Sequence, residues 1–137
     1  MILKRLITII FVFAVSLFWV SCRRATHYDV STPQRALDTL RAAISNKDLE
    51  TFKRTLSART LEWLESEAIR TNKLVDELLQ DYVARKSENI SPVRPEKEER
   101  IDGNTVELLS GNGRILGRFV REGDEWKLDG FGWPMKT

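Results

Sequence analysis

One cysteine and one histidine carry the most versatile side-chain chemistry in this chain. Cys22 is the single cysteine and His27 the single histidine of the 137 residues. A lone cysteine excludes an internal disulfide, and it also excludes a zinc site built on several thiolates. His27 stands in a stretch without hydrophobic periodicity, so we expect a solvated side chain whose ring no folded element orients. The sequence therefore predicts neither a metal site nor a cofactor.

Two further groups of residues could carry chemistry. Glu107, Arg118 and Asp129 fall in one row of a predicted sheet, with Arg118 between two carboxylates. Such a row could serve acid–base catalysis, but on an exposed sheet face cross-strand ion pairing of small net value explains it better. Trp63 and Tyr82 could face a ligand, although aromatic side chains at helical spacing are more often core.

Four predicted helices precede the sheet and must position these groups. Thr32 is the expected N-cap of the first helix and Pro33 its first residue. Asp48 is expected to cap a short second helix, and Ser57 or Thr60 a third, which Asn72 ends. A fourth helix is predicted from Lys73 to about Lys86. The apolar positions of these helices recur at three- and four-residue spacing and should face the core: Ala36, Leu37, Leu40, Ala43, Ile44, Leu49, Phe52, Leu56, Leu61, Leu64, Ala68, Leu74, Val75, Leu78, Leu79, Tyr82 and Val83.

From Ile101 onward the pattern alternates as in β-strands. Asp102-Gly103, Asn112-Gly113 and Gly123-Asp124 are expected to form tight two-residue turns. The last two turns, chosen independently, place Val106 opposite Phe119 and Phe119 opposite Leu128. They yield one apolar face composed of Val106, Leu108, Ile115, Phe119, Trp126 and Leu128, which Ile101 could join from the edge. Pro92, Pro95 and the charges of 96–100 predict a solvated connector that leads into an edge strand.

The segment before Cys22 has the layout of an export signal. Lys4 and Arg5 precede the apolar run Leu6–Val20, which at about 15 residues is short for a membrane span. Residues 19–22 resemble the lipobox of bacterial lipoproteins, except that Trp19 stands where leucine is usual. The resemblance implies a signal peptide over residues 1–21, cleavage before Cys22, and acylation of its thiol by chains such as palmitate. An uncleaved membrane anchor with an incidental Cys22 is the alternative.

These observations divide the chain and indicate a location. Residues 22–31 are expected to be the acylated cysteine and a tether, and 32–137 a single domain. Either form of anchor places the domain on a membrane. Arg23, rather than aspartate, follows the cysteine, which favours the outer membrane if the source has two membranes. Without Lys4 and Arg5 the chain has 20 basic and 20 acidic side chains, so a nucleic-acid partner is not indicated.

Helices followed by an antiparallel meander resemble the small lipoprotein domains of the nuclear-transport-factor-2-like, cystatin-like superfamily. The resemblance is carried by Thr32-Pro33 with Ala36, by 46–50, by 61–64 and by the final Gly-Asp-Glu-Trp-Lys-Leu-Asp of 123–129. It implies an α+β fold in which a curved sheet of three to four strands forms a cone. Its pocket would be lined by Trp63, Tyr82, Val106, Leu108, Phe119, Trp126 and Leu128. The enzymes of this group place Asp, His or Tyr inside the cone.

Three functions remain open at this point. The leading hypothesis is a non-enzymatic module of the cell envelope that binds a small apolar ligand or an envelope protein. The second is a small isomerase, dehydratase or hydrolase with Tyr82 or an unplaced aspartate as acid or base. The third is a structural domain whose cone is filled by its own side chains. The sequence predicts no catalytic constellation.

Overall fold

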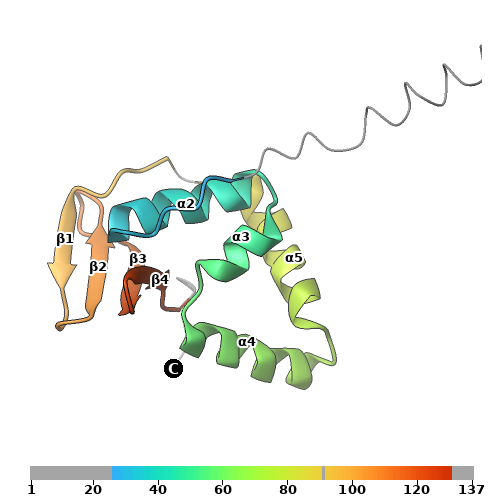
Figure 1. Ribbon diagram of the computed structural model, residues 1–137. Coiled ribbons are helices and arrows are strands. Elements are labelled where there is room, and N and C mark those ends of the chain that lie inside the picture. Colours follow the sequence, from blue (N-terminus) through green and yellow to red (C-terminus); the bar gives the residue numbers. More distant parts are fainter. Residues whose placement is uncertain (1–25, 91, 131–137) are drawn as a thin grey trace, which may run out of the picture.

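The computed structural model describes residues 26–90 and 92–130, which form an α+β fold with helices packed on an antiparallel sheet (Figure 1). The helices come first and the strands follow, as the sequence predicts. The predicted signal peptide 1–21, Cys22 and the final residues 131–137 lie outside the described residues. The elements are α2 (Pro33–Ser45), α3 (Leu49–Arg54), α4 (Ala58–Thr71), α5 (Val75–Ser87), β1 (Lys97–Arg100), β2 (Thr105–Leu109), β3 (Ile115–Glu122) and β4 (Glu125–Leu128).

Short polar side chains set where three of these helices begin. The hydroxyl of Thr32 accepts a hydrogen bond from the N–H of Arg35, and Pro33 occupies the first turn of α2 as predicted. Asp48 and Ser57 cap α3 and α4 in the same way. Each cap satisfies a backbone N–H for which the first helical turn has no intrahelical acceptor.

The connection between α4 and α5 corrects one prediction. α4 ends at Asn72, whose φ of 53° is a left-handed conformation that asparagine tolerates. α5 begins two residues later than predicted, so Leu74 precedes the first turn instead of belonging to the inward face. Leu74 is consequently 70% exposed. The buried side chains of α5 are Leu79 and Val83.

The sheet has the predicted register over most of its length. The strands lie in the order β1-β2-β3-β4, all antiparallel. Val106 faces Phe119, and Phe119 faces Leu128 across the next pair. Residues 123–124 form the expected two-residue turn between β3 and β4, with Gly123 at a φ of 62°. The apolar face is therefore continuous over three strands.

A bulge between Leu108 and Leu109 overturns the prediction for Ile115. The register of β2 and β3 shifts there by one residue, so Ile115 faces Leu109. A one-residue shift sends a side chain to the opposite face of the sheet, and Ile115 is 53% exposed rather than buried. The predicted two-residue turn at 112–113 is part of a longer connection over residues 110–114.

The first strand forms an exposed edge. The connector before it leads into β1, all four residues of which are charged and exposed. Charged side chains of this kind discourage pairing with another chain. β1 and β2 are joined by residues 101–104 instead of the two-residue turn predicted at Asp102-Gly103. Ile101 lies in this loop and is 50% exposed, so its predicted place on the apolar face is wrong.

The opposite edge of the sheet is covered by the helical part of the chain. The N–H of Leu128 donates to the carbonyl of Thr55 at 2.7 Å, and the N–H of Ser57 donates to the carbonyl of Leu128 at 2.9 Å. Leu56 between them forms a parallel bridge with Leu128. This backbone pairing attaches the α3–α4 connection directly to β4.

The end of the expected tether is part of the folded domain. The carbonyl of Val30 accepts a hydrogen bond from the N–H of Trp126 at 2.9 Å, and Val30 is 4% exposed. Asp29 exchanges two hydrogen bonds with the hydroxyl of Thr39 on α2. Further toward the N-terminus, the N–H of Thr26 lies 3.4 Å from Oδ2 of Asp48. The stretch from Thr26 to Val30 therefore packs on the domain, because these polar contacts and one apolar side chain hold it.

The core lies between the apolar face of the sheet and the helices. α2 runs from the sheet to the group formed by α3, α4 and α5 and contacts both (Figure 1). Its stripe at Leu37, Leu40 and Ile44 is buried, as the helical spacing predicts. Phe119 from the sheet and Phe52 from α3 are completely buried. One apolar cluster thus includes both parts of the fold.

Replacing Phe119 by alanine should lower the free energy of unfolding by about 3 to 5 kcal/mol, because the variant leaves a cavity in the core. Chemical denaturation measures this change. Ile115→Ala on the same strand is the matched control, and its half-exposed side chain should cost less than about 1 kcal/mol. A loss within about half a kcal/mol for Phe119→Ala would contradict the register.

Candidate binding groove

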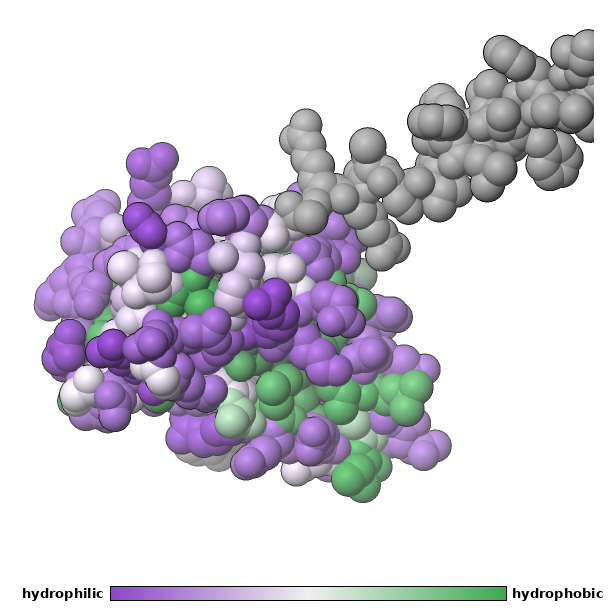
Figure 2. Space-filling model, in the orientation of Figure 1, coloured by the Kyte–Doolittle hydropathy of each residue, from purple (hydrophilic) through white to green (hydrophobic). Residues whose placement is uncertain are grey.

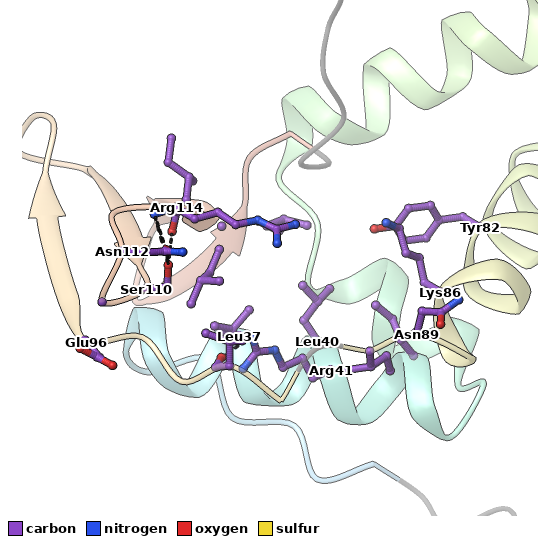
Figure 3. Close-up of a pocket in the computed structure, with 18 of the residues that line it drawn as sticks. Leu37, Leu40, Arg41, Tyr82, Lys86, Asn89, Glu96, Ser110, Asn112 and Arg114 are labelled. Atoms are coloured by element: carbon purple, nitrogen blue, oxygen red, sulfur yellow. Dashed lines mark hydrogen bonds between the residues drawn. The ribbon is translucent and has the colours of Figure 1, made fainter.

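A groove of about 1070 Å³ lies between α2, α5 and the β2–β3 connection (Figure 3). It is at the upper end of the size range of small-molecule sites in proteins. The connector before β1 contributes to its border. The groove is lined by Leu37, Leu40, Arg41, Ile44, Tyr82, Arg85, Lys86, Asn89, Ile90, Val93, Glu96, Ser110, Gly111, Asn112, Arg114, Ile115, Leu116, Gly117 and Leu128.

The floor of the groove is apolar. Leu37, Leu40 and Ile44 come from one face of α2, and each is less than 8% exposed. Leu116 and Leu128 extend this surface from the sheet. The same α2 stripe thus packs into the core and presents its outer edge to the groove. The apolar surface that a ligand could remove from water, at a gain of about 25 cal/mol per Å², includes Val93 and Ile115, which line the groove and are 43% and 53% exposed.

The rim of the groove is predominantly basic. Four cationic side chains line it, from α2, α5 and the β2–β3 connection, and Glu96 is the carboxylate that lines it with them. The four are Arg41, Arg85, Lys86 and Arg114. Among the described residues, no carboxylate forms an ion pair with Lys86 or Arg114. The rim therefore presents a local positive charge that the net charge of the chain does not reveal.

Arg41 ties the connector to the wall of the groove. Its Nη2 donates to the carbonyl of Val93 at 2.7 Å. Burial lowers the pKa of Arg41 from its ordinary value, and the nearby Asp38 carboxylate acts in the opposite direction. A guanidinium nevertheless stays protonated in proteins. Arg41 is thus a partly buried cation whose position is fixed by a backbone carbonyl.

The β2–β3 connection holds the backbone of Arg114 in place. The N–H of Arg114 lies 3.2 Å from both Oγ of Ser110 and Oδ1 of Asn112, and its carbonyl accepts from the N–H of Ser110 at 2.9 Å. Gly113 takes a φ of 82°, which other residues rarely adopt. Figure 3 shows the Arg114 side chain extending from this loop into the hollow toward α5. The loop is therefore ordered around a cationic side chain that points into the groove.

Glu96 lies directly beside Gly111 at the sheet end of the groove. A Cβ atom at residue 111 would lie 2.3 Å from Oε2 of Glu96, so a larger residue there would displace the flexible Glu96 carboxylate. The backbone N–H of Glu96 donates to the carbonyl of Leu109 at 2.9 Å, which continues the pairing of the edge strand. The carboxylate is thus positioned at the border of the groove.

Tyr82 lies on the α5 wall with its ring stacked on Phe52. The ring centroids are 5.6 Å apart and the planes 17° from parallel. Burial raises the pKa of the Tyr82 phenol, and the Arg85 charge lowers it by less. The hydroxyl therefore stays protonated at neutral pH and can donate a hydrogen bond. A protonated phenol does not serve as a general base at that pH.

The residues predicted to line a pocket fall into three groups. Tyr82 and Leu128 line the groove. Val106, Leu108, Phe119 and Trp126 are in the core, at most 9% exposed. Trp63 is 43% exposed on α4 and does not line the groove. The apolar face of the sheet is therefore filled by the protein's own side chains, and the hollow lies at its margin.

The predicted row of charges separates into two ion pairs. Arg118 binds Oε1 of Glu107 through Nε at 2.9 Å and Nη2 at 2.6 Å. Asp129 instead accepts from the hydroxyl of Ser57 at 3.0 Å and pairs with Arg59. The backbone N–H of Asp129 donates to the carbonyl of Arg118 at 2.9 Å, so the predicted row is present in the backbone register. The Asp129 side chain, however, lies at the N-terminus of α4, where a carboxylate is favoured. Arg118 therefore pairs with Glu107 while Asp129 pairs with Arg59, and the expected exposure of Glu107 is wrong, because it is 7% exposed.

Apolar side chains also reach the surface at the turn between α4 and α5. Ile69 is 83% exposed and Leu74 70%. Figure 2 shows this apolar area at the end of the molecule where α4 and α5 meet. It lies on a protruding turn and does not border the groove.

Comparisons with protein-family models, with curated proteins and with solved structures find no match for this chain. Within residues 26–90 and 92–130, no three His, Cys, Asp or Glu side chains come together in a way that could hold a metal ion. In the same part of the chain, no helix combines the length and apolar character needed to cross a membrane.

The basic residues of the groove were not predicted from the sequence. Arg41 is not among the apolar positions predicted to face the core, and Arg114 directly follows the predicted Asn112-Gly113 turn. These two residues lie on separate elements of the chain, and it is the packing of these elements that brings both residues into the lining of one groove. The Asn112-Gly113 pair is the one local signal that a loop is built at this position.

Alkaline titration should distinguish Tyr82 by its tyrosinate absorbance. One of the two tyrosines should ionise at a pH above 10.0, the ordinary pKa of a tyrosine. The Tyr82→Phe variant should lack this ionisation. The unfolded chain ionises first, so the free energy of unfolding should fall as the pH rises past 10.0. The Tyr82→Phe variant should lack this contribution. A wild-type chain in which neither of its two tyrosines titrates above 10.0 would refute the buried position.

Proposed function

We propose that this protein is a lipid-anchored, non-enzymatic binding module of the cell envelope, and that the groove is its binding site. The observation that carries the proposal is the groove itself, a hollow of about 1070 Å³ with an apolar floor and a polar, charged rim. Such a combination is typical of small-molecule sites, where apolar surface supplies affinity and a few polar groups fix orientation.

The location rests on the N-terminal sequence. The apolar run of Leu6–Val20 followed directly by Cys22 supports export and acylation of the cysteine thiol. Two or three acyl chains would hold the protein at a bilayer without any contact from the domain. Arg23 favours the outer membrane where two membranes exist. The domain would then be free to bind a ligand.

We also propose a place in the nuclear-transport-factor-2-like superfamily for this domain. The order of the elements, with helices before an antiparallel meander, supports this assignment. An enzymatic function receives less support, because the Tyr82 phenol has a raised pKa and is unsuited to act as a base at neutral pH. The carboxylates of Glu107 and Asp129 are occupied by ion pairs with arginines.

The anchor can be tested by the intact mass of the protein extracted from membranes. We expect a chain that begins at Cys22 and carries additional acyl mass. The Cys22→Ala variant should retain Met1 and gain no acyl mass, since the thiol is the acylation site. An unmodified wild-type chain that still contains Met1 would reject the lipoprotein assignment.

Binding in the groove can be tested with an uncharged, apolar fluorescent probe such as N-phenyl-1-naphthylamine. Ile115→Asp places a carboxylate at the groove and should weaken binding by about tenfold, because the probe would then cover a charge. Ile101→Asp is the matched control: its side chain is 50% exposed against 53% for Ile115, but it does not line the groove. Equal binding by both variants would exclude the groove as the site.

A further inference from the structure

We propose that the groove selects an anionic amphiphile. Its alkyl or aryl chain would lie on the floor formed by α2, and its carboxylate or phosphate group would be held among Arg114, Arg41 and Lys86. This inference rests on the proposed binding function and adds the chemical class of the ligand. Its basis is the combination of an apolar floor with an excess of cations on three different walls.

The charge of the groove is strongly one-sided. Its lining includes four cationic side chains and one carboxylate, Glu96. That carboxylate lies against Gly111 at the sheet end, in contact range of the loop backbone. Elsewhere in the described chain, arginines form ion pairs with adjacent acids, as in the pairs Arg118–Glu107 and Arg59–Asp129. Among the described residues no such ion pair is formed by Arg114 or Lys86, so an anion in the groove would supply the opposite charge that these two cations lack.

The cations approach from opposite sides of the hollow. Arg114 extends from the β2–β3 connection, and Lys86 belongs to α5 on the other side (Figure 3). Arg41 comes from α2, where the carbonyl of Val93 holds its guanidinium. The cations of the lining therefore come from three elements around the hollow. Guanidinium groups also bind carboxylate and phosphate oxygens in a bidentate geometry that fixes orientation.

The Tyr82 hydroxyl adds a neutral donor on the α5 wall. Figure 3 shows its ring on the same side of the groove as Lys86, with the hydroxyl directed into the hollow. Its stacking on Phe52 fixes the ring. A protonated phenol donates to an anionic oxygen without itself carrying a charge. This arrangement suits an anionic group better than a cationic or apolar one.

The floor has the dimensions for a chain rather than for an isolated ion. Leu37 and Ile44 are two turns apart on α2, which corresponds to about 10 Å of helix. Leu40 lies between them, and Leu116 faces the same hollow from the sheet. A small inorganic anion would leave the exposed apolar side chains of the lining, Val93 and Ile115, in contact with water. An amphiphile would cover them and at the same time reduce the positive charge of the rim.

The test compares three ligands with the same ten-carbon chain: decanoate, decyl phosphate and decanol. The full acylated chain is placed in lipid nanodiscs, and binding is measured by calorimetry with empty nanodiscs as the blank. We expect the two anions to bind about tenfold more tightly than the alcohol, since charge-assisted hydrogen bonds are strong. The stronger of the two anions identifies whether a carboxylate or a phosphate is preferred.

Arg114→Gln should remove the advantage of the anions and leave the affinity for decanol unchanged. Arg100→Gln is the matched control, because Arg100 is an exposed arginine on β1 that does not line the groove. Equal affinities of wild-type protein for decanoate, decyl phosphate and decanol would overturn the selection of anions but leave the binding groove intact. Absence of binding by all three, together with no binding of the uncharged probe, would overturn the proposed function as well.

Discussion

The backbone pairing of Leu128 with Thr55 and Ser57 is the contact on which the rest of the fold depends. It covers the edge of β4, which would otherwise expose unpaired N–H and C=O groups. It also fixes the start of α4 relative to the sheet, because Ser57 is both a partner in this pairing and the N-cap of that helix. α4 leads into α5, so the position of the α5 wall of the groove follows from this junction. The groove is thus a consequence of how the helices are attached to the sheet.

Local signals in the sequence were sufficient for most of the fold. Thr32, Asp48 and Ser57 correctly predicted where helices begin. A helix cap is a hydrogen bond between a side chain and a backbone N–H within one turn, so it can be predicted from local sequence. The bulge at Leu109 lies beside Gly117, and glycine within a strand often marks such an irregularity, but glycine alone does not specify the register shift from which the exposure of Ile115 follows. The groove was missed for a different reason. Its cations lie on separate elements that only tertiary packing brings together. Hydrophobic periodicity predicts the buried face of a single helix or strand and does not predict which elements pack together.

Electrostatic balance over a whole chain says little about a single surface. The part after the predicted signal has as many basic as acidic side chains, which argued against a charged partner. In the fold, several acids are engaged away from the groove: Asp129 with Arg59, Glu107 with Arg118 and Asp29 with Arg35. Because these acids lie away from the groove, the rim of the groove is basic. A neutral domain can therefore present a local field of one sign.

The contact between Thr26 and Asp48 has a consequence for how far the domain can travel. If Cys22 is embedded in a bilayer through its acyl chains, as we propose, residues 23–25 lie between it and Thr26, and the four backbone steps from Cys22 to Thr26 span about 14 Å at most. The domain would therefore stay close to the lipid headgroups and would not reach the rest of the compartment. Molecules that dissolve in or collect at that bilayer would meet it at high effective concentration, whereas molecules dilute in the aqueous phase would not.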